Sequence, residues 1–103
     1  MPLKKPQHTF RAKIWLYQGM AGWHFVTVPK KLSATIKKNT AHVQRGWGSV
    51  RVQVTIRTTV WNTSIFPDRM SGTYLLPLKA QVRKKEGLLY DEMVTVTIVI
   101  GNL

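Results

Sequence analysis

The sequence predicts a mainly β fold, a small closed or nearly closed barrel of about six strands with two short helices. Apolar and polar residues alternate along several segments, as in strands with one buried face. In addition, Pro29 and Pro77 each end an apolar segment and begin a basic one, which indicates two successive strand-strand-helix-strand units. Two such units protect each other's open sheet edges when they close into a barrel.

The chain has 103 residues, a length that suits one domain, because two cores of about 50 residues each would leave too much apolar surface in water. We expect residues 1–7 to form a flexible N-terminal tail and residues 8–103 to form a single β-barrel domain. The apolar stretches fall far short of the about 20 residues that a membrane-spanning helix needs. The N-terminus also lacks the pattern of a signal peptide. We therefore expect a cytoplasmic protein with no membrane partner.

The first two strands are predicted on either side of a glycine-containing turn. Residues 8–17 alternate, so the apolar side chains at positions 10, 12, 14 and 16 share the inner face, which includes Leu16. Trp15 falls on the outer face together with two basic residues. Residues 23–28 return as the second strand of a hairpin.

Each helix is predicted directly after a proline. Proline suits the first helical turn because the missing N–H has no partner there. After Pro29, the segment KKLSATIKKN places Leu32 and Ile36 one turn apart on a short apolar stripe. After Pro77, the segment LKAQVRKKEG is predicted as a short helix that Gly87 ends.

Four further strands complete the predicted barrel. Residues 50–56 and 94–100 alternate most clearly, so both segments place a row of Val and Ile in the core. The segment TVWNTSIF is expected to pair back with the first of these, with the bend near residues 58–59. PDRMSG, at residues 67–72, has the composition of a loop. TYLLP, at residues 73–77, is predicted as the remaining strand.

Charge is the strongest compositional signal. Lys and Arg number 16 and Asp and Glu number 4, which gives a formal net charge of +12. A small protein with this surplus attracts polyanions such as nucleic acid by electrostatic steering and counterion release. The alternative interpretation is a cationic surface that serves solubility alone. The sequence does not decide between them.

Three segments of the chain carry a resemblance to a known family: RGWGSVRVQVTI, WNTSIFPDRMSGTYLLPLKAQVRK and DEMVTVTIVI. In these segments the chain resembles the bacterial domain of unknown function 1905 (DUF1905). The resemblance covers most of the chain and implies a compact β-barrel with short helices, with no established activity. The chain departs from the family at residues 57–59, where the family tends to have two glycines, and at Tyr90, where it has Gly before Asp.

The chain is poor in the groups that catalysis needs. Its four carboxylates include one adjacent pair, Asp91 and Glu92, which strand geometry would turn to opposite faces. The three histidines lie far apart without ligand spacing, and the absence of cysteine excludes disulfides and thiolate metal sites. We therefore predict no catalytic residues, no metal site and no cofactor, and expect a binding module rather than an enzyme.

Lys79 and Arg83 are the strongest candidates for a site, because residues four apart project from one face of a helix. Together they can hold a phosphate or carboxylate, Arg83 with two parallel hydrogen bonds and Lys79 as a point charge. Arg45 and Trp47 in the glycine-rich connection add charge and a stacking surface. The structural alternatives are a pairing of Lys79 or Arg83 with Asp68, and packing of Trp47 and Trp61 in the core.

The preferred prediction is a non-enzymatic binding module for an anionic partner, nucleic acid or another polyanion. A second hypothesis is a small-molecule pocket at the barrel mouth near Ser64, Tyr74, Lys79 and Arg83. A third is a protein-interaction module that accompanies a partner enzyme. The sequence leaves the ligand and the oligomeric state open.

Overall fold

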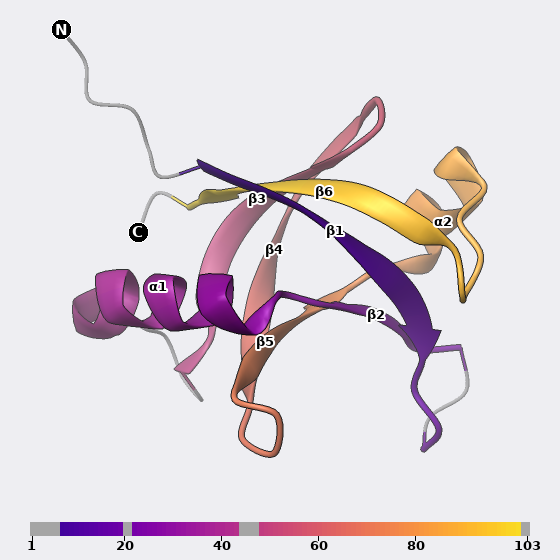
Figure 1. Cartoon of the computed structure of the whole chain (residues 1–103). Helices are drawn as coiled ribbons and strands as arrows, with labels where there is room; N and C mark the ends of the chain where they lie inside the picture. The colour runs from indigo at the N-terminus through magenta and orange to yellow at the C-terminus, as the bar shows by residue number, and fades with distance from the viewer. Residues whose placement is uncertain (1–6, 20–21, 44–47, 102–103) are drawn as a thin grey trace, which may run out of the picture.

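The computed structural model describes residues 7–19, 22–43 and 48–101. Within these residues the chain forms a closed antiparallel barrel with the strand order β1-β2-β5-β4-β3-β6 (Figure 1). The elements are β1 (Gln7–Leu16), β2 (His24–Thr27), α1 (Lys30–Thr40), the 3-10 helix η1 (Ala41–Val43), β3 (Val50–Ile56), β4 (Thr59–Asp68), β5 (Thr73–Pro77), α2 (Ala80–Glu86) and β6 (Met93–Ile100). The predicted barrel of six strands with two helices is confirmed.

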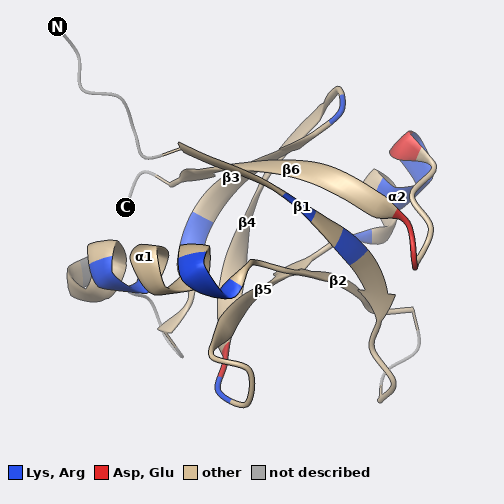
Figure 2. Ribbon diagram, viewed as in Figure 1, with Lys and Arg blue, Asp and Glu red and all other residues tan. Residues whose placement is uncertain are grey.

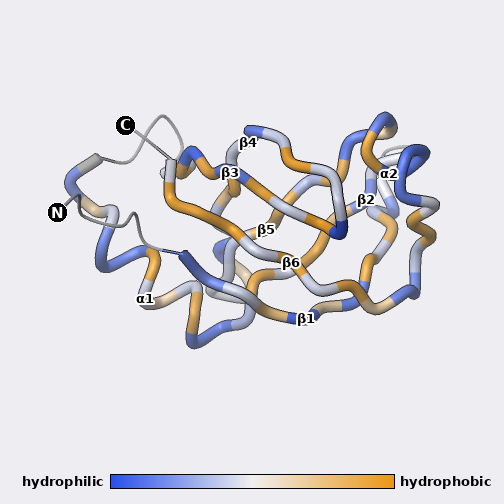
Figure 3. Tube along the Cα trace, turned by 90° about the horizontal axis from the view of Figure 1, so that it is seen from above, coloured by the Kyte–Doolittle hydropathy of each residue, from blue (hydrophilic) through white to orange (hydrophobic). Residues whose placement is uncertain are grey.

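The alternating segments supply the barrel interior. Val52 and Val54 of β3 and Val96 and Ile98 of β6 are all at most 2% exposed, and Val54 lies opposite Ile98 in the register. The tube in Figure 3 shows the resulting alternation of apolar and polar positions along the strands. Because β1 pairs with β6, the first and last strands of the chain close the barrel.

The two helices lie at opposite ends of the barrel (Figure 1). α1 begins directly after Pro29, as predicted, and buries Ile36 completely. α2 ends at Gly87, whose φ of 65° is the left-handed conformation that favours glycine, also as predicted. Neither helix, nor any other helix among the described residues, is long and apolar enough to cross a bilayer.

Leu16 is a correction to the predicted inner face of β1, because its side chain is 37% exposed. The pairing of β1 with β6 ends at Lys13 and Met93, so β1 continues past the end of β6. Position 16 therefore lies beyond the barrel interior, and the inner face of β1 ends at Ile14, which is fully buried.

The loop predicted at residues 67–72 is shorter than expected. β4 continues through Pro67 to Asp68, and Pro67 lies opposite Tyr74 of β5. The proline is tolerated because β3 pairs with β4 only as far as Ile65, so from Phe66 onward β4 has a neighbouring strand on one side alone.

The bend between β3 and β4 is a two-residue turn at Arg57 and Thr58, one position earlier than expected. Ile56 lies opposite Thr59, which fixes the length of the turn. Arg57 has a φ of 53°, a conformation that favours glycine. Of the predicted tail at residues 1–7, Gln7 is the first residue of β1, and residues 1–6 lie outside the described part of the chain.

Candidate ligand-binding groove

A groove forms where β4 and β5 separate. The two strands pair at three positions, from Phe66 opposite Leu75 to Asp68 opposite Thr73. Beyond Leu75, β5 continues along β2 to Pro77, whose ring nitrogen has no hydrogen to donate to a neighbouring strand. β4 instead follows β3 from Ile65 back to Thr59. The strands part, and a groove of about 670 Å³ lies between them beside the start of α2.

Aromatic and cationic side chains line this groove. Trp61 is 8% exposed and belongs to the barrel core, whereas Trp23 at the start of β2 is 48% exposed. The cations are Arg51, Lys79 and Arg83. Among the described residues that line the groove there is no carboxylate, so no acidic group offsets these three positive charges.

Arg83 has a positioning role. Its Nε–H donates to the carbonyl of Leu78 at 3.1 Å, and its Nη2 donates to the carbonyl of Gly22 at 3.2 Å. These bonds connect α2 to the end of β5 and to the turn before β2. A guanidinium has five N–H groups, so others remain for a ligand. The predicted alternative of an Arg83–Asp68 pair is not formed, and Asp68 accepts a hydrogen bond from Ser71 at 2.7 Å.

Lys79 and Arg51 are the exposed cations of the groove. Lys79 precedes α2 in an extended conformation, and Arg51 points outward from β3. The side chain of neither residue has a hydrogen bond or ion pair with another described residue. The backbone of Arg51 is fixed, since Ser64 lies opposite it and its carbonyl accepts a hydrogen bond from the Gly101 N–H at 2.6 Å.

The structure brings together only some of the predicted site residues. Lys79 and Arg83 line the groove together. Ser64 is half-buried in β4 and does not line it, and Tyr74 lies inside the barrel at 3% exposure. Arg45 and Trp47 lie outside the described residues.

Sequence reasoning missed Trp23, His24 and Arg51 as groove residues. Trp23 and His24 reach the groove because the Leu78 N–H donates to the carbonyl of His24, which holds the start of β2 beside the end of β5. Alternation along residues 50–56 indicates only that Arg51 points outward from its strand. The strand register is needed to place it near Trp61, and alternation within one strand carries no information about that register.

Three of the four carboxylates are concentrated at the C-terminal end of α2 and in the segment that follows it (Figure 2). Arg57 bonds to two of these three residues. Its Nη2 forms an ion pair with Glu92 Oε2 at 2.9 Å, and its Nη1 donates to the backbone carbonyl of Glu86 at 2.6 Å. The Glu86 carboxylate accepts hydrogen bonds from the hydroxyls of Thr59 and Thr58. The carboxylates of Glu86 and Glu92 are thus engaged outside the groove.

Hydrogen bonds hold the pKa of both glutamates below the ordinary value of about 4.5. For Glu86 the main causes are the hydroxyls of Thr59 and Thr58. For Glu92 they are the Leu89 N–H and the guanidinium of Arg57. Both carboxylates are therefore charged at neutral pH. In the described part of the chain, this segment included, no cluster of three or more His, Asp or Glu side chains is suited to bind a metal ion.

Comparison with known families gives a match to the model of a domain of unknown function (DUF1905) over residues 10–98. The matched range begins in β1 and ends in β6, so it includes the barrel and every groove residue named above. A search of curated proteins finds no match.

Proposed function

The chain belongs to the DUF1905 family, and from the groove between β4 and β5 we propose that it is a binding module for an anionic, phosphate-bearing ligand. One observation carries the proposal: three cations and two tryptophans line the same groove, and no carboxylate is among its described lining residues. A phosphate requires positive charge and N–H donors, and a planar base or ring requires an aromatic surface.

Each groove residue has a separate role in this proposal. Lys79 and Arg51 contact the phosphate oxygens, Lys79 as a point charge and Arg51 with parallel N–H donors. Trp23, which is 48% exposed, offers the face of its indole to a planar group. Arg83 holds the start of α2 in place through its two backbone acceptors.

Charge reversal at Lys79 tests the proposal. Binding of a labelled random-sequence oligonucleotide and of a labelled mononucleotide is measured by fluorescence anisotropy at about 50 mM and about 200 mM salt. Lys79→Glu is expected to weaken binding of both by about tenfold or more, because a hydrogen bond to a charged group is lost and a repulsive charge is added.

Lys31→Glu is the matched control, because Lys31 is an exposed lysine on α1 at the other end of the barrel. It changes the net charge by the same amount and is expected to have a clearly smaller effect. The proposal is wrong if neither ligand binds at the lower salt concentration. It is also wrong if the two variants weaken binding equally, because binding would then depend on net charge alone.

A small anionic metabolite is the second candidate, and the size of the groove favours it. A volume of about 670 Å³ lies within the range of about 300–1,000 Å³ that is usual for small-molecule sites. If this candidate is correct, affinity does not increase from a mononucleotide to an oligonucleotide. The cytoplasmic location predicted from the sequence is compatible with either ligand.

A further inference from the structure

Four aromatic side chains gather on the outer surface of β1 and β2. The ring centroid of Phe25 lies 5.2 Å from that of Trp15, 5.8 Å from that of Trp23 and 6.0 Å from that of Tyr17. Trp15 and Phe25 lie next to the fully buried Ile14 and Val26 in their strands, so both are on the outer face of the sheet. Tyr17 directly follows β1 and Trp23 directly precedes β2. Tyr17 is 43% exposed and Trp23 is 48% exposed.

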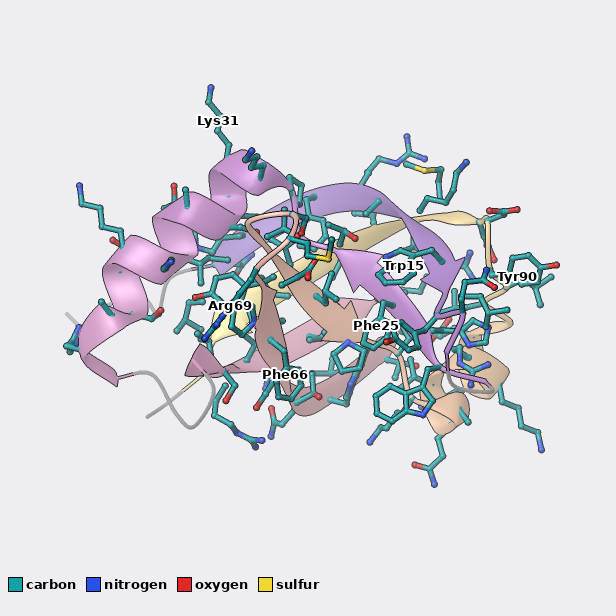
Figure 4. All side chains as sticks on the ribbon, turned by 90° about the horizontal axis from the view of Figure 1, so that it is seen from below. Trp15, Phe25, Lys31, Phe66, Arg69 and Tyr90 are labelled. Atoms are coloured by element: carbon teal, nitrogen blue, oxygen red, sulfur yellow. The ribbon has the colours of Figure 1, made fainter. Side chains whose placement is uncertain are left out.

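The apolar surface continues across two more strands. Pro77 of β5 lies opposite Phe25, and Leu75 of β5 lies opposite Phe66 of β4, which is 44% exposed. In Figure 4, Trp15 and Phe25 lie close together over β1 and β2, and Phe66 lies over β4. We call this surface the aromatic face; its residues are Trp15, Tyr17, Trp23, Phe25, Phe66, Leu75 and Pro77.

One ring of the aromatic face is fixed by a hydrogen bond, and the neighbouring rings pack against each other at an angle. The Trp15 Nε1–H donates to the Thr27 hydroxyl at 2.9 Å, which fixes the indole on the sheet. The interplanar angles are 33° for Trp15 with Phe25 and 41° for Trp23 with Phe25. Tyr17 meets Phe25 edge to face at 76°. None of these pairs is a parallel stack, so ring surface remains for a ligand.

The aromatic face is continuous with the groove. Trp23 and Pro77 belong to both, and Lys79 and Arg83 follow Pro77 in the sequence and line the groove beside it. Exposed rings on adjacent strands next to cationic side chains are the combination with which proteins bind single-stranded nucleic acid, where bases stack on the rings and phosphates contact the cations.

We propose that the aromatic face binds the unpaired bases of a single-stranded nucleic acid while the groove binds its phosphates. The inference rests on the proposed function and names its ligand. The net charge of +12 opposes the docking of a second copy and favours a polyanion. A duplex keeps its bases stacked on each other, so it cannot use the rings, and a mononucleotide is too short to occupy the groove and the face together.

Two conservative variants test the inference. Tyr17→Leu and Phe66→Leu keep apolar volume on the sheet and remove a ring, and neither residue lines the groove. Each variant is expected to weaken binding of a single-stranded oligonucleotide of about 12 nucleotides by about fivefold or more, because stacking of one base contributes about 1–3 kcal/mol. Binding of a duplex of the same sequence is expected to be weaker than that of the single strand and to change little in these variants.

Leu89→Ala is the control, because Leu89 is 69% exposed and lies outside the aromatic face. It is expected to bind the single strand as the wild type does. Circular dichroism and the thermal midpoint establish that each variant is folded before it is compared.

The outcomes separate the two proposals. If Lys79→Glu weakens binding but the two ring variants bind single strands like the wild type, the inference is wrong and the proposed function stands. Tighter binding of the duplex also overturns the inference. If sedimentation shows a dimer that Tyr17→Leu and Phe66→Leu dissociate, the face is an interface between copies and the inference is likewise overturned.

Discussion

Arg57 combines an unfavourable backbone conformation with favourable side-chain contacts. Its φ of 53° is a left-handed conformation that favours glycine. Here the side chain pairs with Glu92 and donates to the carbonyl of Glu86, which connects the β3–β4 turn to the segment after α2. The contacts of the side chain stabilise the turn, and the backbone conformation at the same residue destabilises it.

Substitution of Arg57 separates these two effects. Arg57→Ala loses the contacts and keeps the unfavourable φ, whereas Arg57→Gly loses the contacts and relieves the backbone. We therefore expect Arg57→Ala to be less stable than Arg57→Gly by about 1 kcal/mol in urea unfolding. Equal stabilities of the two variants would contradict the conformational argument.

Glu86 and Glu92 make the free energy of unfolding of the protein depend on pH. Their pKa values in the folded protein are below the ordinary value, so their hydrogen bonds stabilise the fold above about pH 4.5. That contribution is lost as the pH falls through the lowered pKa values. We expect the urea midpoint to fall as the pH is lowered below about 4.5 and through the lowered pKa values of the two glutamates. The fall of the urea midpoint should be smaller in Glu86→Gln. If this variant shows the same pH dependence as the wild type, Glu86 does not contribute to the loss of stability in acid.

At the scale of elements, Ser33 attaches α1 to the barrel. Its buried hydroxyl donates to the carbonyl of Val28 at 3.1 Å and accepts a hydrogen bond from the Tyr74 N–H at 3.0 Å. One side chain of α1 thus bonds to the end of β2 and to β5. Because the site is 2% exposed, water does not replace these bonds when the hydroxyl is removed.

Ser33→Ala is expected to reduce the free energy of unfolding by about 2 kcal/mol, measured by urea unfolding. Thr35→Ala is the control on the same helix, because the Thr35 hydroxyl donates to the Lys31 carbonyl at an exposed position. It is expected to change the stability by less than about 0.5 kcal/mol. Similar losses in both variants would contradict a special role of the Ser33 hydroxyl, because helix propensity favours alanine at both positions.

The elements themselves were predictable, because alternation and the two prolines are local signals. Residues 50–56 and the segment after Pro29 show this, since their strand and helix were predicted nearly to the residue. The exposure of Leu16 was not predictable, because it depends on where β6 ends. The groove was half predictable. Lys79 and Arg83 both line it, although Lys79 lies just before α2 and does not share a helix face with Arg83 as the spacing predicts. Arg51 and Trp23 reach the site through pairings between strands.

At the scale of the whole molecule, the net charge of +12 acts on folding as well as on binding. The basic residues are spread over α1, β1, β3 and α2, whereas the acidic ones lie in two places (Figure 2). Folding brings the positive charges together, so their repulsion destabilises the compact state, and salt reduces this repulsion.

We therefore expect the urea midpoint of the protein without ligand to rise when KCl is increased from about 10 mM to about 300 mM. Lys31→Glu removes repulsion and should show a weaker dependence on salt. A midpoint that is constant or falls with KCl would show that ion pairs such as Arg57–Glu92 outweigh the repulsion.

The pairing of β1 with β6 has a consequence for the newly made chain. Thr9 bonds to Thr97 across this pair, so the barrel joins residues that are 88 positions apart in the sequence. Contacts between residues so far apart in the sequence form late, and proteins that depend on such contacts fold slowly. During synthesis, β1 can pair with β2 soon after both are made, but its other edge stays unpaired until translation of β6 is complete.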